Sequence, residues 1–287
     1  MATETLKQPE TKRPDGYPFH IGTRLVNHRD AEGNIVGHHH EPLTEEGYLH
    51  PQEEDRFMST DRHSVALHYL KHALAVGLGG QTRFRVFTEM RVDWQQPGIE
   101  PHGPDAIVFD GFQGDFDDMA GTVPVEDFAA KVLVVFEVTS PSTRHIDFGL
   151  KLDEFVEVGI PYFMVIDAAA PNGVPTVIGM RLVRGGYRTM RNDPKLGVQV
   201  PELKLWFRWD RDRLVAADID GKDIPDSAEL GVAFEGERAR AESEKARAES
   251  EKARAETEKA RADAADAKAE ALAAELAELK ARLNEAS

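Results

Sequence analysis

The segment Lys131–Val138, which reads Lys-Val-Leu-Val-Val-Phe-Glu-Val, limits the possible folds more than any other part of the chain. It is an almost unbroken apolar run of strand length, which is typical of a central strand buried on both faces. Glu137 is the exception within it, because an ionised carboxylate in a buried strand is costly unless it is paired or binds a metal ion. The run therefore predicts an α/β core that carries a carboxylate near the carboxyl end of a central strand, where open α/β sheets tend to place their sites.

The flanking patterns predict further strands and two helices around this one. A helix can start at Ser59 or Thr60, since either residue can cap it, and the glycines at 77–80 end it. A second helix is expected over 147–158. Strands are expected over 82–89, 106–109, 162–166, 176–183, 187–190 and 203–209. The simplest assembly of these parts is a mixed β-sheet flanked by helices.

Residues 1–55 are predicted to be a polar N-terminal extension, with at most a short strand near 33–36. His38, His39 and His40 lie within it. Three adjacent histidines can bind a transition metal, but consecutive side chains do not converge from a regular element, so an exposed loop is the simpler interpretation. The chain has no cysteine and no apolar run of membrane-spanning length, and it begins without an apolar segment. These features predict a cytoplasmic protein without disulfides.

The C-terminal part repeats a seven-residue unit of strong helix formers, beginning at Glu237. Leu272, Leu276, Leu279 and Leu283 follow at spacings of 4, 3 and 4, as in the seam of a coiled coil. We expect a linker over 226–236, and over 237–287 a charged helix that forms a coiled coil and a homo-oligomer. A lone solvated helix is the alternative, because the alanine-rich repeats bury little area.

The charge of the chain limits how it can meet nucleic acid. The formal net charge is −16, and the part before Glu235 accounts for −13 of it. An acidic body repels polyanions and argues against strong non-specific binding of DNA. A role on DNA would need a local basic patch, a metal ion or a partner.

Two carboxylates and a lysine are placed where they could form a site. Asp105 follows Gly103-Pro104 and opens the strand expected at 106–109, so it can meet Glu137 at one sheet edge if the two strands are neighbours. A pair of carboxylates suits Mg²⁺. Lys151 shares a helix face with Asp147 and could offset negative charge at a phosphate.

Each of these residues also has a structural explanation. Asp105 could be a turn residue, Lys151 could pair with Asp147 on the surface with Glu154 close by, and Glu137 could be a satisfied core carboxylate. The three together favour a metal site more than any one of them does.

Several motifs resemble those of a known family. They are Pro104-Asp105 before an apolar strand, Glu137-Val-Thr-Ser-Pro-Ser-Thr143, Asp147-x-x-x-Lys151, Gly159-Ile-Pro-Tyr162 and Val165-Ile-Asp167. The set is similar to the Uma-two family, which is classed among the restriction-type endonucleases of the PD-(D/E)xK superfamily. The resemblance covers roughly residues 56–210, and we take 56–225 as the nuclease-like domain.

The resemblance implies a restriction-endonuclease-like core with Mg²⁺ or Mn²⁺ at the sheet edge. Asp105, Glu137 and the backbone carbonyl of Val138 would hold the ion. The lysine of the usual motif would fall at position 139, which is Thr139 here, and Lys151 on the following helix would replace it. The expected activity is metal-dependent hydrolysis of DNA. A nuclease-like interaction module that does not cleave and assembles through its tail, and a hydrolase of another phosphoester, are the alternatives.

Overall fold

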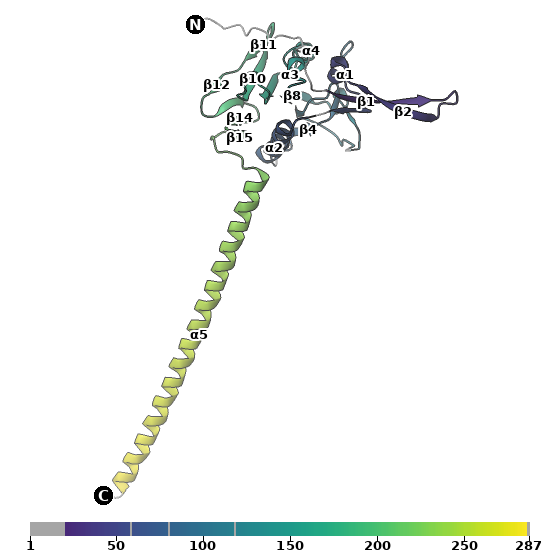
Figure 1. Ribbon diagram of the computed structural model, residues 1–287. Helices are drawn as coiled ribbons and strands as arrows, with labels where there is room; N and C mark the ends of the chain where they lie inside the picture. Colours follow the sequence, from purple (N-terminus) through teal and green to yellow (C-terminus); the bar gives the residue numbers. More distant parts are fainter. Residues whose placement is uncertain (1–20, 58, 80, 118, 286–287) are drawn as a thin grey trace. The chain divides into compact units, whose positions relative to one another are not determined.

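The computed structural model describes residues 21–57, 59–79, 81–117 and 119–285. The chain divides into two compact units, one ending at Asp226 and the other beginning at Ser227. The first unit is built on a six-stranded sheet with the order β11-β10-β9-β8-β6-β4 (Figure 1). Its strands are β4 (Phe84–Thr88), β6 (Ala106–Asp110), β8 (Lys131–Val138), β9 (Tyr162–Asp167), β10 (Thr176–Val183) and β11 (Gly186–Thr189). β8 and β9 are parallel and the other neighbours are antiparallel, so the predicted mixed α/β sheet is confirmed.

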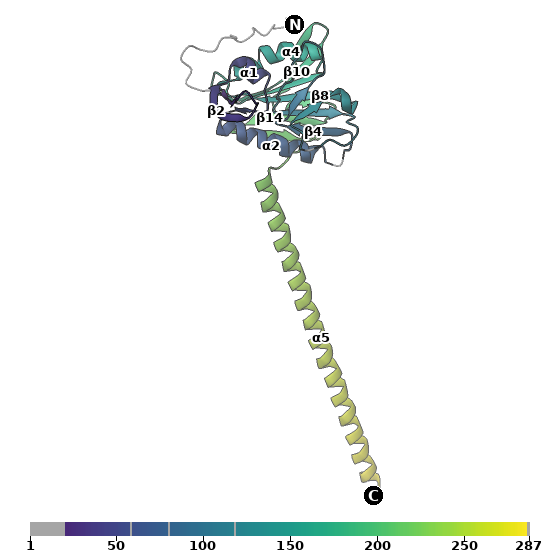
Figure 2. The same ribbon diagram turned by 90° about the vertical axis from the view of Figure 1, so that its right-hand side faces the viewer.

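Alternation along the central strands divides the apolar core between the two faces of the sheet. Val134, Phe136 and Val138 of β8 belong to a core shared with α2 (Asp61–Gly77). Val135, one position out of phase, belongs to a second core with Phe155 of α4 (Leu150–Val158). The two helices thus cover opposite faces (Figure 2). Glu137 shares the phase of Val135, so its side chain lies on the α4 side.

A second, antiparallel sheet packs on the α2 side. It runs β12 (Asn192–Asp193), β13 (Gly197–Val200), β14 (Leu205–Asp210) and β15 (Arg213–Ala217). The rings of Phe136 and Phe207 meet with centroids 5.1 Å apart, which joins the two sheets. The same unit contains a small parallel pair, β5 (Arg91–Asp93) and β7 (Thr122–Pro124), and the 3-10 turn η1 (Glu126–Phe128).

The helix expected over 147–158 is divided in two. The short helix α3 (Arg144–Asp147) ends before Gly149, and α4 begins at Leu150. Gly149 has φ −120° and ψ −96°, which is far from helical values and breaks the run. Asp147 and Lys151, expected on one helix face, therefore come from two separate helices.

The prediction of a polar extension with at most a short strand was wrong for the described part of residues 1–55. β1 (Gly22–Arg29), β2 (Ile35–Pro42) and β3 (Asp55–Phe57) form a sheet, and α1 (Glu45–Leu49) follows β2. The Asp30 carboxylate accepts from the backbone of Asn34 and closes the hairpin turn, and Arg24 binds Asp55 through two hydrogen bonds. Backbone pairing joins these strands, and the side-chain contacts that support it are polar, so no apolar pattern marks the strands in the sequence. Residues 1–20 of the predicted extension lie outside the described residues.

The three adjacent histidines lie on β2 and not in a loop. His39 Nδ1 is 2.8 Å from His28 Nε2 on β1, and His39 Nε2 is 2.7 Å from the Glu41 carboxylate. His38 and His40 lie close to each other, with ring centroids 6.4 Å apart. Strand alternation thus separates His39 from its two neighbours in sequence.

The second unit is one helix, α5 (Ser227–Glu285). Residues 227–236, expected as a linker, are helical and continuous with the repeats, although Gly231 and Gly236 lie among them. Leu272 and Leu276 are 54% and 55% exposed, while the side chains of Leu279 and Leu283 lie outside the described part. Within the described residues, no helix combines the length and the apolar character needed to cross a membrane.

Candidate active site

Asp105 and Glu137 come from neighbouring strands. β6 pairs antiparallel with β8, with Ala106 opposite Phe136, so residue 105 lies beside the carboxyl end of β8. The backbone N–H of Val138 donates to Asp105 Oδ2 over 2.7 Å. Asp105 therefore lies beside the carboxyl end of β8, the strand that carries Glu137.

Lys151 lies between two buried carboxylates. Its Nζ is 3.0 Å from Glu137 Oε2 and 3.2 Å from Asp147 Oδ1. The exposed fractions of Lys151, Glu137 and Asp147 are 1%, 1% and 0%, so Lys151 and Asp147 do not form a surface pair. The ring of Tyr48, from α1, lies 4.6 Å from Nζ and covers the lysine from the other side.

The buried charges do not balance. Burial raises the pKa of Glu137 well above its ordinary value, although Lys151 opposes this, and burial likewise raises the pKa of Asp147. Burial alone would lower the pKa of Lys151, but the carboxylates of Glu137 and Asp147 outweigh it and raise that pKa well above its usual range. One ammonium thus faces two buried carboxylates, and Asp105 adds a third negative charge nearby. A divalent cation or a bound proton would offset the excess.

The donor set fits a hard divalent cation such as Mg²⁺ or Mn²⁺. Glu137 Oε1 is buried and has no hydrogen-bond partner among the described residues. The Asp105 carboxylate is held at the end of the same strand by the Val138 N–H, and oxygen ligands of this kind are those that Mg²⁺ prefers. Val138 contributes its N–H to Asp105, and ligation by its carbonyl oxygen stays a prediction.

His63 is a neighbour of Asp105 that the sequence analysis missed. It lies in the first turn of α2, and its Nε2 is 3.2 Å from Asp105 Oδ2. Burial lowers its pKa, but the bond to Asp105 and the surrounding carboxylates outweigh burial and raise the pKa above its ordinary value. No local signal distinguishes His63 from His68 and His72 on the same helix.

A cavity of about 640 Å³ opens beside Asp105. Its lining includes His63, Asp105, Tyr48, Arg91 and Thr143, but neither Glu137 nor Lys151. Asp105 is therefore the part of the predicted set that faces the cavity, and the Glu137–Lys151 pair lies behind it.

Thr139, which occupies the position of the usual lysine, has a structural role. Its hydroxyl donates to Asp167 Oδ1 over 2.9 Å, and Arg144 binds both oxygens of the same carboxylate. The contacts fasten the loop after β8 to the end of β9 and thereby fix the position of α3.

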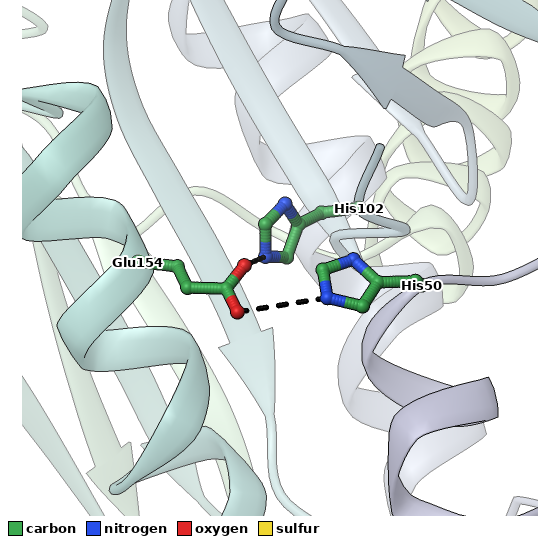
Figure 3. Close-up of side chains that lie close together, drawn as sticks. All are labelled: His50, His102 and Glu154. Atoms are coloured by element: carbon green, nitrogen blue, oxygen red, sulfur yellow. Dashed lines mark ion pairs between the residues drawn. The ribbon is translucent and has the colours of Figure 1, made fainter. Parts of the chain in front are cut away.

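Glu154 lies apart from Lys151, in a second group of titratable residues. Glu154 Oε2 is 2.8 Å from His102 Nε2, and Glu154 Oε1 is 3.5 Å from His50 Nε2 (Figure 3). His102 is fully buried; burial, with the charges of His50 and Lys151, lowers its pKa to about 3. No local sequence pattern marks this group, because its members lie far apart in the chain.

No family model and no curated protein matches the chain. Among solved structures, a protein from Anabaena variabilis described as a "putative nuclease belonging to DUF820" aligns at 18% identity with a TM-score of 0.41, covering 57% of this chain and 86% of that one. The Uma-two resemblance drawn from the motifs is not confirmed by these comparisons.

Proposed function

We propose that the protein is a metal-dependent endonuclease that hydrolyses phosphodiester bonds of DNA. Asp105, Glu137 and the Val138 carbonyl would hold Mg²⁺ or Mn²⁺, and Lys151 would stabilise charge. The strongest support is that the Val138 N–H at the end of β8 binds the Asp105 carboxylate. On the same strand, Glu137 Oε1 has no hydrogen-bond partner among the described residues, and Glu137 Oε2 lies 3.0 Å from the Lys151 ammonium. Such an ion, when bound, lowers the pKa of a water molecule and polarises the phosphate.

The residues of the chain supply position and charge. The Val138 N–H fixes the Asp105 carboxylate, and His63 contacts the same oxygen from α2. Lys151 is held by two carboxylates and by the ring of Tyr48, so its ammonium cannot reorient freely. A fixed positive charge near the phosphate stabilises the transition state more than a mobile one, because no reorganisation is needed.

Nicking of plasmid DNA with Mg²⁺ or Mn²⁺ tests the proposal. We expect Asp105→Asn and Glu137→Gln each to lower the cleavage rate at least ~100-fold, as loss of an electrostatic stabiliser does. Asp110→Asn is the matched control, because Asp110 ends the same strand but pairs with Arg83. Folded variants at positions 105 and 137 that cleave like the wild type would contradict the assignment.

One observation favours a second function, that of a nuclease-like interaction module without cleavage. Glu137 and Lys151 are buried and do not line the cavity, and the body of the chain is acidic. In this case the buried charged side chains contribute to the stability of the fold and have no catalytic role. Wild-type protein that is folded and inactive on plasmid DNA with both ions would favour this second function.

A further inference from the structure

His50, His102 and Glu154 bring three ligand atoms together from three separate parts of the first unit. One atom from each residue lies within 4.8 Å of the other two, and among the described residues this is the one group of three possible ligands that meets this distance. His50 caps the end of α1, His102 precedes β6, and Glu154 lies on α4 (Figure 3). We propose that the three side chains bind a divalent transition metal ion of the zinc type, at a site separate from the Asp105–Glu137 pair.

The donor set selects the class of ion. Two imidazole nitrogens and one carboxylate form a common zinc ligand set with an open fourth position. Mg²⁺ prefers oxygen ligands and binds imidazole poorly. Glu46 Oε1 lies 3.8 Å from His50 Nε2 but does not belong to the group of three, so the fourth position stays open. The two sites of this chain should therefore differ in their metal preference.

His50 is oriented as a metal ligand should be. Its Nδ1 is 3.3 Å from the carbonyl oxygen of Pro101. A carbonyl only accepts hydrogen bonds, so Nδ1 carries a proton, and Nε2, which faces Glu154, is the nitrogen that would bind the ion once it has given up any proton of its own. An outer partner of this kind usually fixes the ring of a ligating histidine.

His102 and Glu154 present buried polar atoms that lack hydrogen bonds. His102 Nε2 and Glu154 Oε2 lie 2.8 Å apart, but they do not meet as a hydrogen bond, and neither has another partner among the described residues. Leaving such atoms unsatisfied is costly. An ion at the point where they converge with His50 would satisfy both.

A hydrogen bond from Trp94 to His102 competes with metal binding at His102. The indole N–H donates to His102 Nδ1 over 2.5 Å, which in the metal-free protein leaves the ring proton on Nε2. When the ion takes the Nε2 lone pair, that proton must go to solvent, or to Nδ1 with the indole turned away. Replacing the indole by a ring without a donor removes this competition, so Trp94→Phe should bind zinc at least as tightly as the wild type.

The ion would join the segments that carry the proposed active site. His50 follows Tyr48 by two residues, His102 precedes Asp105 by three, and Glu154 follows Lys151 by three. Binding would thus hold α1, the loop before β6 and α4 in fixed positions. The zinc site does not depend on the proposed nuclease activity.

Calorimetric titration of the full chain with Zn²⁺ tests the site, in a background where His38, His39 and His40 are replaced by alanine so that the exposed hairpin does not compete. We expect one Zn²⁺ per chain that excess Mg²⁺ does not displace. Glu154→Gln and His50→Gln should each weaken binding at least ~10-fold, whereas Glu157→Gln, on an exposed position of the same helix, should not. Zn²⁺ should raise the Tm of the background protein and not that of Glu154→Gln.

Other outcomes would overturn the proposal. Folded Glu154→Gln and His50→Gln that both bind Zn²⁺ like the background protein would place the ion elsewhere. If the background protein binds no Zn²⁺, then His50, His102 and Glu154 form a contact without a metal ion. Any zinc binding by the wild type would then belong to the hairpin histidines. Asp105→Asn separates the two sites, since it should keep full zinc affinity whether or not the protein is a nuclease.

Discussion

Lys151 is the residue on which the buried charges depend. It is the shared partner of Glu137 and Asp147, at 3.0 and 3.2 Å. Removing one member of a buried ion pair leaves an uncompensated charge, which costs more than the pair itself contributes. We expect Lys151→Met to lower the free energy of unfolding by about 3–5 kcal/mol. Adding Glu137→Gln should recover part of this loss. Chemical denaturation of the single and double variants at pH 7 measures both effects.

A surface pair supplies the control for this measurement. Arg208 binds Asp223 at 2.8 Å, and the Asp223 carboxylate is about half exposed to solvent. We expect Arg208→Met to cost about 0–1 kcal/mol. If Lys151→Met costs no more than Arg208→Met, or if the double variant is less stable than the single one, the account of the buried charges is wrong.

His63 should make stability depend on pH. Its folded-state pKa is raised, although burial opposes the effect of Asp105. A raised pKa means that the folded state binds the proton more tightly, so the contribution is fully present below the unfolded-state pKa and is lost as pH rises through the folded-state pKa. The gain in stability between pH 8 and pH 6 should therefore be smaller in His63→Gln than in the wild type. His68→Gln, five residues further along α2, is the control and should match the wild type; equal gains in all three proteins would contradict this role of the Asp105 contact.

The candidate site could be predicted only where local patterns mark it. Glu137 is marked by its place in an apolar run, and Asp105 by its place before a strand. The contacts of His63, Tyr48 and His102 join segments that are far apart in the sequence. No local sequence pattern predicts which distant segments meet. Glu154 was expected beside Lys151, but the turn of α4 directs it to His50 and His102 instead.

At the scale of single elements, the cap of α2 can be tested directly. The sequence allows Ser59 or Thr60 as the cap, and the structure selects Thr60, whose side chain accepts from the His63 N–H. Ser59 bonds instead to the Ser64 hydroxyl. We expect Thr60→Ala to lower the free energy of unfolding by about 1 kcal/mol and Ser59→Ala to have little effect, both measured by denaturation. The reverse order would show that the helix begins one residue earlier.

The sequence predicted elements best where burial leaves a long apolar signal. β8 and β10 match their expected ranges. β8 is buried on both faces, and β10 begins with alternating burial. β5 and β7, which were not predicted, are only three residues long, too short to show a period. The β1–β2 hairpin was missed for another reason, since its burial pattern is mostly exposed and its side chains are polar.

At the scale of the whole molecule, the two units depend on different forces. The first unit has apolar cores on both faces of a sheet. The second is a helix of 59 residues, roughly 90 Å long. The described side chains of α5 are exposed along its whole length, including Leu230 and Phe234 near its start. A helix without a core of its own is stabilised mainly by propensity and by charge pairs such as Arg238–Glu242, which contribute little each.

We expect α5 to self-associate through its leucine seam. Burial of Leu272 and Leu276 in a dimer would contribute on the order of 8 kcal/mol, at roughly 2 kcal/mol for each of four side chains. Association costs about 4–15 kcal/mol, so these two positions alone do not secure a dimer, and Leu279 and Leu283 must add to them. The expected result is a weak dimer, measured by sedimentation of the full chain at tens of micromolar. Leu272→Asp/Leu276→Asp should make it monomeric, whereas Ala274→Asp/Ala277→Asp, with the same charge on the opposite helix face, should not. A wild-type chain that remains monomeric at these concentrations would leave α5 as a solvated helix, because no other seam of the repeat carries large apolar side chains.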